Sequence, residues 1–169
     1  MSVSITDKRR VALAYDGSDD ARKLFDWTIK NIIRPESDHL ILLSAVQRSA
    51  SNAVPGRRRS SSPELPMLST TATKMDQAME ETEHHPTARE RLEDMSAQLR
   101  KAKISSEEHI LWGDAKTLLP RYTQSNKVDL LIMGSRGLGA VKSVFLGSVS
   151  DACLKECPCP VLVVRNTTI

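Results

Sequence analysis

The chain has 169 residues and a net charge of +3, with 27% charged and only 4% aromatic residues. This length suits one domain with a substantial core. The small charge excess and the scarcity of aromatic side chains argue against nucleic-acid binding. No apolar run approaches the roughly 20 residues of a membrane span, and residues 1–10 lack a signal-peptide core. We therefore expect a cytoplasmic protein without membrane association, with the nucleus as the alternative compartment.

The first half of the chain contains two apolar runs separated by a helical pattern. The run 11–15 predicts a central buried strand. Asp16-Gly17-Ser18 predicts a turn in which Ser18 caps a helix that ends before Pro35. The run 39–46 then predicts the second strand.

A change of composition marks residues 49–86, which are rich in Ser, Thr, Pro and Arg. Such a composition predicts a flexible, solvent-exposed insertion within the domain. Three arginines precede Ser60, Ser61 and Ser62, and Pro63 follows them. Basic-directed or proline-directed kinases favour such sites, and each phosphate would change the local charge by about −1.5 to −2. The alternative is a surface insertion without a regulatory role.

The second half continues the alternation of helices and strands. Helical spacing predicts a helix over 87–102, and a second helix follows Gly113-Asp114, where Pro120 predicts a late start or a kink. Strands are expected at 108–112, 128–133 and 161–164, and a last helix at 149–156. Five such strands predict an open doubly wound parallel sheet with helices on both faces. In the order 3-2-1-4-5, the carboxyl ends of strands one and four are neighbours at a topological switch point.

The three cysteines, Cys153, Cys157 and Cys159, all lie near the C-terminus. An odd number of cysteines in a reducing compartment argues against a disulfide framework. Cys153 and Cys157, at i and i+4, could share a metal or oxidise, but because no histidine is nearby we expect buried or half-buried free thiols.

Glycines follow the strand 128–133 at positions 134, 137 and 139, and Gly147-Ser148 stands before the last helix. Glycine allows positive φ and lets backbone N–H groups approach an anion closely. The helix start adds unpaired N–H donors and a partial positive charge, to which Ser148 or Ser150 can add a hydroxyl. The pattern predicts a polyphosphate site; a glycine turn and a helix cap without a ligand is the alternative.

Two familiar phosphate motifs fail at this loop. Ala140 and Val141 follow Gly139 where a P-loop has Lys and Ser or Thr, and the dinucleotide fingerprint lacks its third glycine. The spacing of Gly134, two residues, Gly137, nine residues and Gly147-Ser148 resembles the nucleotide-binding signature of the universal stress protein family, in its ATP-binding branch. The stretches AYDGSDDA, FLGSVSDACL and CPVLVV are similar to family stretches too.

This resemblance covers nearly the whole chain apart from the insertion. It implies a single universal stress protein domain over 1–169, with an adenine nucleotide alpha hydrolase-like fold. It also implies a homodimer paired through the edge strand Val161 to Val164, and a role in stress responses.

Matching positions imply a set of nucleotide-binding residues. Asp16 and Val46 would contact adenine, and Gly113 would lie near the ribose. The ribose and phosphates would be lined by Met133, Gly134, Gly137, Gly147, Ser148, Val149 and Ser150, while Ala14 and Tyr15 belong to the set beside Asp16. Arg136 is a further candidate, which could pair with a phosphate oxygen or point into solvent. From the residues alone, Asp16 is either a turn residue or a ligand carboxylate.

The expected function is a nucleotide-dependent stress-response signalling module whose ligand is ATP or AMP, with or without Mg²⁺. One alternative is a slow ATPase or phosphoryl-transfer enzyme, although the missing P-loop lysine argues against efficient turnover. Another is a structural dimer that binds no nucleotide. The downstream protein partner is not specified by the sequence.

Overall fold

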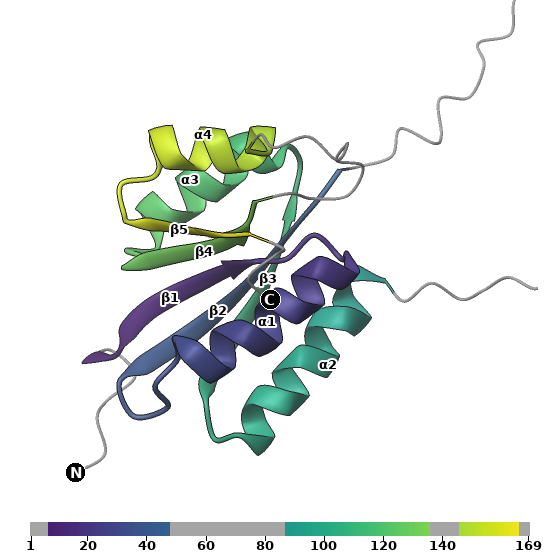
Figure 1. Cartoon of the computed structure of the whole chain (residues 1–169), viewed down its shortest axis with the longest axis vertical. Coiled ribbons are helices and arrows are strands. Elements are labelled where there is room, and N and C mark those ends of the chain that lie inside the picture. Colours follow the sequence, from purple (N-terminus) through teal and green to yellow (C-terminus); the bar gives the residue numbers. More distant parts are fainter. Residues whose placement is uncertain (1–6, 48–86, 136–145, 166–169) are drawn as a thin grey trace, which may run out of the picture. The chain divides into compact units, whose positions relative to one another are not determined.

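Five parallel strands form a single sheet in the order β3-β2-β1-β4-β5 (Figure 1). The computed structural model describes residues 7–47, 87–135 and 146–165. The strand order predicted from the sequence is confirmed. The strands are β1 Arg9–Ala14, β2 Asp38–Val46, β3 Ser105–Trp112, β4 Leu130–Gly134 and β5 Val161–Val164. The insertion at 49–86, with Ser60, Ser61 and Ser62, lies outside the described residues.

Four helices cover the two faces of this sheet: α1 Asp19–Asn31, α2 Ala88–Lys101, α3 Ala115–Ser125 and α4 Ser148–Glu156. α1 and α2 lie on one face, and α3 and α4 on the other (Figure 1). Alternate residues of a strand point to opposite faces. Accordingly Leu42 of β2 packs with α1 and α2, while Leu43 packs in the core below α3 and α4. The predicted doubly wound arrangement is therefore confirmed.

Helix caps fix where α1 and α2 begin. The Ser18 hydroxyl accepts a hydrogen bond from the Ala21 N–H at 3.1 Å, as predicted. Thr87 and Glu90 form a capping box, in which the Glu90 carboxylate accepts from the Thr87 N–H at 2.6 Å. α1 ends at Asn31, before Pro35. Each of these helices thus starts at a side chain that satisfies its first N–H groups.

One predicted boundary in the second half is wrong. β3 begins at Ser105 and not at 108, because its polar residues pair with β2 from His39 onward. α3 begins at Ala115, directly after Gly113-Asp114 as predicted, and runs through Pro120, so of the two alternatives for Pro120 the late start is excluded. The Asp114 carbonyl already accepts from the N–H groups of Thr117 and Leu118, which closes the first turn before Pro120 is reached. The other boundaries differ from the predictions by at most two residues.

The three cysteines are free thiols, as predicted. Cys153 is fully buried in the core between the sheet and α4, whereas Cys157 and Cys159 are half-buried. Burial, followed by the neighbouring Cys157, raises the pKa of Cys153 to about 12, and burial also raises the pKa of Cys159. Both thiols are therefore protonated at neutral pH.

None of the helices in the described ranges is both long enough and apolar enough to span a bilayer.

Candidate functional site

The carboxyl ends of β1 and β4 lie side by side in the middle of the sheet. Leu13 of β1 pairs with Ile132 of β4, and the two strands then continue in parallel past this pair. β1 also pairs with β2 on its other side. The chain adds β2 and β3 on one side of β1 and β4 and β5 on the other, so the direction of the connections reverses here. The structure therefore brings the predicted residues Ala14, Tyr15 and Asp16 to the same sheet edge as Met133 and Gly134, at the topological switch point.

Asp16 forms the turn that follows β1. Its Oδ1 accepts hydrogen bonds from the Ser18 N–H at 3.0 Å and from the Ser18 hydroxyl at 2.7 Å. Gly17 has a φ of +86°, and its carbonyl accepts from the Arg91 guanidinium of α2 at 3.0 Å. Of the two roles open to Asp16 in the sequence, the turn role is present. Its contact with adenine stays a prediction.

Tyr15 and Met133 are parts of the core at this edge. Tyr15 packs with α1 and α2, and its N–H donates to the Leu43 carbonyl at 2.7 Å. Burial raises the pKa of its phenol, although Arg91 and Arg22 oppose this rise. Met133 is buried on the opposite face, where the half-buried Ala14 also packs. These side chains therefore pack on both faces of the sheet at the carboxyl ends of β1 and β4.

Val46 is the last residue of β2, and Gly113 directly follows the last residue of the neighbouring strand β3. The Gly113 N–H donates to the Val46 carbonyl at 3.0 Å, which joins the two positions directly. Gly113 has a φ of +143°, a value that disfavours residues with a side chain. Both residues therefore lie at the same sheet edge as Asp16, one and two strands away from β1.

The start of α4 is tied to the end of β4 by two hydrogen bonds. The Gly147 N–H donates to the Ser135 carbonyl at 2.8 Å, and the Ser150 hydroxyl donates to the Gly134 carbonyl at 3.0 Å. The Ser150 hydroxyl, expected to meet a phosphate, is thus engaged by the protein in this structure, and Ser150 is buried. The first-turn N–H groups of Ser148, Val149 and Ser150 have no acceptor within a helix. The predicted residues Arg136 and Gly137 lie outside the described residues.

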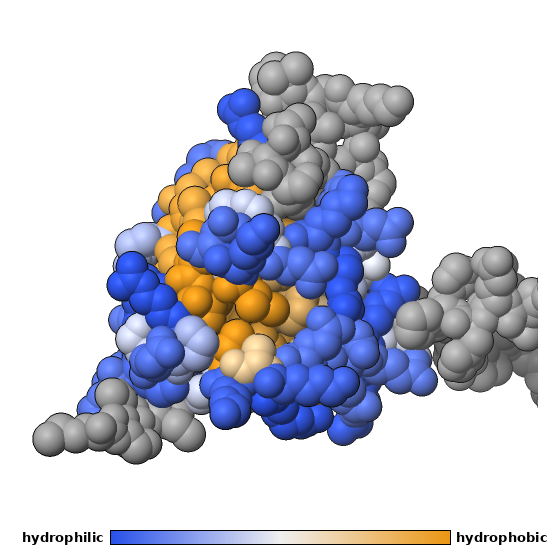
Figure 2. Space-filling view, turned by 60° about the horizontal axis from the view of Figure 1, so that its bottom comes forward, coloured by the Kyte–Doolittle hydropathy of each residue, from blue (hydrophilic) through white to orange (hydrophobic). Residues whose placement is uncertain are grey.

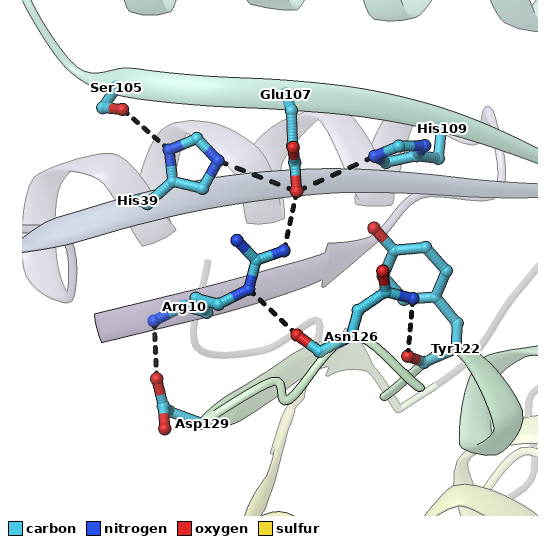
Figure 3. A network of polar contacts seen from close by, with 8 residues as sticks. All are labelled: Arg10, His39, Ser105, Glu107, His109, Tyr122, Asn126 and Asp129. Atoms are coloured by element: carbon cyan, nitrogen blue, oxygen red, sulfur yellow. Dashed lines mark hydrogen bonds and ion pairs between the residues drawn. The ribbon is translucent and has the colours of Figure 1, made fainter. Parts of the chain in front are cut away.

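A second polar group, which the sequence analysis missed, lies toward the amino ends of the strands (Figure 3). Glu107 accepts a hydrogen bond from Arg10 at 2.9 Å, and its Oε1 is 3.7 Å from Nε2 of both His39 and His109. The Arg10 guanidinium also donates to the Asn126 carbonyl at 3.0 Å. Polar residues at every second position of β3 were the available signal, since they share one face.

This network joins three strands to the end of α3. His39 is buried, and its Nδ1 lies 2.7 Å from the Ser105 hydroxyl. The described ranges contain no group of three His, Cys, Asp or Glu side chains arranged to hold a metal ion. Arg10 binds the Glu107 carboxylate that both histidines approach, and it also bonds the Asn126 carbonyl. The network therefore holds β3 next to the end of α3.

Replacing His39 with glutamine is expected to flatten the pH dependence of stability between pH 7.5 and 5.5. Burial lowers the pKa of His39, and Arg10 and Lys8 lower it further, while Glu107 opposes the shift. The unfolded chain therefore takes up a proton first as the pH falls through the ordinary value of 6.5. The free energy of unfolding must therefore fall as the pH falls through this value. Urea unfolding at several pH values measures this loss.

His109→Gln is the matched control, because it removes a half-buried histidine that contacts the same carboxylate and is more exposed than His39. This variant should lose stability between pH 7.5 and 5.5 as the wild type does. An unchanged pH profile in His39→Gln would contradict the assignment to His39.

The sequence profile of the Universal stress protein family matches residues 8–165. The chain belongs to the universal stress protein family. The family resemblance seen in the sequence is thereby confirmed. Universal stress protein PHOS34 of Arabidopsis thaliana is 30% identical over 162 residues, a match that covers 94% of this chain and 62% of that protein. The chain thus spans less than two thirds of this relative.

Two solved structures share the fold of this chain. The structure of the hypothetical protein MJ0577 has a TM-score of 0.67 at 21% identity, covering 94% of this chain and 96% of that one. A universal stress protein family protein from Arabidopsis thaliana, At3g01520, was solved with AMP bound. It has a TM-score of 0.56 at 19% identity, covering 93% and 91% of the two chains. These likenesses establish the adenine nucleotide alpha hydrolase-like fold.

Proposed function

We propose that this universal stress protein binds an adenine nucleotide at the carboxyl edge between β1 and β4. The observation that supports this proposal most directly is that the Asp16 turn follows β1, while the start of α4 is hydrogen-bonded to the end of the neighbouring strand β4 at the same switch point. Open α/β sheets bind ligands at such points. The AMP bound to the related Arabidopsis protein supports the same class of ligand here.

The start of α4 supports binding of the phosphates. Its first-turn amides are directed away from the helix, and the helix dipole adds a partial positive charge. Gly147 as N-cap brings no side chain in front of them. ATP fits this proposal as well as AMP, and Mg²⁺ would enter with the phosphates, because it is commonly bound through substrate oxygens.

We propose that nucleotide occupancy, and not turnover, is what the protein contributes to a stress response in the cytoplasm. Phosphoryl transfer needs a group that positions the nucleophile. Asp16, the carboxylate at the switch point, accepts two hydrogen bonds from Ser18 and holds the turn. A partner protein would then respond to the bound or free state.

Asp16→Asn tests the site while preserving the turn. Asparagine keeps an acceptor for the Ser18 N–H and hydroxyl but loses the charge. Calorimetric titration should show affinity for AMP or ATP falling by about 10- to 100-fold, the range for one hydrogen bond to a charged group. Melting temperature should change little.

Asp19→Asn is the control, since it removes an exposed carboxylate from the first turn of α1. It should bind nucleotide nearly as the wild type does. If the wild-type protein neither copurifies with an adenine nucleotide nor binds one in calorimetry, the proposed function is overturned. Wild-type affinity in Asp16→Asn would remove Asp16 alone from the site.

We also propose a homodimer through β5. This strand is an edge of the sheet, and its apolar residues Val161, Leu162 and Val163 are only half-buried. Figure 2 shows apolar residues gathered in one area of a surface that is otherwise largely hydrophilic. An unpaired apolar edge strand favours pairing with another chain.

Leu162→Lys is expected to convert the dimer to a monomer in sedimentation analysis. A lysine on the edge strand opposes pairing by charge repulsion and desolvation. Leu154→Lys provides the matched control, because Leu154 is 49% exposed on α4, and it should leave the dimer intact. A wild-type protein that sediments as a monomer at micromolar concentration would contradict the dimer.

A further inference from the structure

Trp112 is an exposed indole at the end of an edge strand. Its side chain is 58% exposed, more than Leu154 at 49% or Leu146 at 41%, the other large apolar side chains exposed in the described ranges. Aromatic side chains contribute most when buried, because each can remove a large apolar area from water. Because the Trp112 side chain is mostly exposed, it contributes little of this stabilisation in the free protein.

Trp112 lies beside the residues assigned to the adenine end of the nucleotide. It is paired with Val46 in the β2–β3 register, and the next residue, Gly113, donates its N–H to the Val46 carbonyl at 3.0 Å. Adjacent strands are about 4.8 Å apart. The indole therefore starts one strand away from Val46, at the same edge of the sheet.

The side chains of three strands face the same side at this edge. Ile110 of β3 and Leu42 of β2 both pack with α1 and α2. Alternation along each strand places Trp112 and Val46 on that face as well, and Tyr15 of β1 packs there too. The carboxyl edge thus carries a row of Tyr15, Val46 and Trp112, in which Trp112 is the exposed end.

The surroundings of Trp112 suit a small planar ligand. The nearby positions Gln47, Glu108 and Asp114 are polar and exposed. A single indole among polar neighbours is too small an apolar area for a stable protein interface. An aromatic face does, however, stack well on a base, because every base offers a π-face.

We propose that Trp112 is a further ligand contact, whose indole stacks on the adenine base next to Val46. This inference rests on the proposed nucleotide function and adds to it the side chain that recognises the base. The site then prefers adenine nucleotides over phosphate compounds without an aromatic ring. Trp112 recognises the base, while the start of α4, capped by Gly147, faces the phosphates at the other end.

The test combines affinity with fluorescence. Trp112→Ala should weaken the binding of AMP by about 5- to 150-fold in calorimetry, the range for loss of one base-stacking contact. Trp112→Phe should retain most of the affinity. The chain has two tryptophans, so Trp27→Phe leaves Trp112 as the only indole, and titration with AMP should quench its emission. Ribose 5-phosphate should not quench it.

Leu154→Ala is the control for loss of an exposed apolar side chain, and it should bind AMP as the wild type does. Equal AMP affinity in the wild type and Trp112→Ala overturns the inference, with or without quenching, and leaves the proposed function in place. The inference is also overturned if Trp112→Ala alters the sedimentation coefficient, which would assign the indole to a protein contact. If the wild type binds no nucleotide at all, both proposals fail.

Discussion

Replacing Asp38 with alanine should lower the free energy of unfolding by about 2 to 4 kcal/mol. Asp38 is 1% exposed and accepts from Arg9 at 3.0 and 2.8 Å and from the Arg34 N–H at 2.8 Å. These bonds hold the start of β1 against the loop before β2. Alanine removes all of them and leaves their donors without this acceptor. Urea denaturation at pH 7 measures the loss.

Asp94→Ala is the matched control, because Asp94 also pairs with an arginine, Arg22, at 3.0 Å but is 63% exposed. Screening by water limits such a pair to less than about 1 kcal/mol. Similar losses in the two variants would contradict the argument from burial.

At acid pH, the free energies of unfolding of the wild type and of Asp38→Ala should become more similar than they are at pH 7. Burial by itself raises the pKa of the Asp38 carboxyl, but the hydrogen bonds from Arg9 and the Arg34 N–H more than offset it, so the pKa lies below its usual 3.8. Because the folded-state pKa is depressed, the stabilisation is present above the ordinary value. It is lost as the pH falls through the lowered one.

Gly17→Val is expected to cost about 2 to 4 kcal/mol of stability and to abolish the proposed nucleotide binding. Gly17 has a φ of +86°, which a β-branched residue adopts only with strain. A Cβ at this position would also fall on Nη1 of Arg91, the donor to the Gly17 carbonyl. The neighbouring Asp16 would then be displaced from its place at the end of β1.

Two further variants separate strain from collision at Gly17. Gly17→Asn should be milder than Gly17→Val, because asparagine tolerates positive φ better than β-branched residues do. Adding Arg91→Ala to Gly17→Val should recover only the part of the loss caused by the collision. Full recovery in the double variant, measured by thermal unfolding against Arg91→Ala alone, would show that backbone strain contributes nothing.

Local patterns were sufficient to predict most of the fold. Strands such as 39–46 are short apolar runs, and Ser18 caps α1 where a hydroxyl precedes two acidic residues. The doubly wound parallel sheet follows from right-handed crossovers between such elements. β3 was harder to delimit because it is an edge strand, and its polar start at Ser105 lacks an apolar run.

The site was predictable as a set of positions but not as a set of contacts. The glycine spacing located Gly134 and Gly147 correctly at one sheet edge. It could not predict that the Ser150 hydroxyl bonds the Gly134 carbonyl, because this contact depends on how α4 packs. The Arg10–Glu107 ion pair joins residues 97 positions apart, so no local pattern could reveal it.

The central place of β1 has a consequence for folding on the ribosome. β1 can pair with β2 early, but its other neighbour begins at Leu130, and the Arg10 N–H meets Asp129 across 119 positions. Until the last quarter of the chain emerges, one side of the apolar residues Val11–Leu13 of β1 remains an open edge. Such late parallel pairing slows folding and favours aggregation. The nascent chain is therefore most vulnerable along this edge, where a chaperone would protect it best.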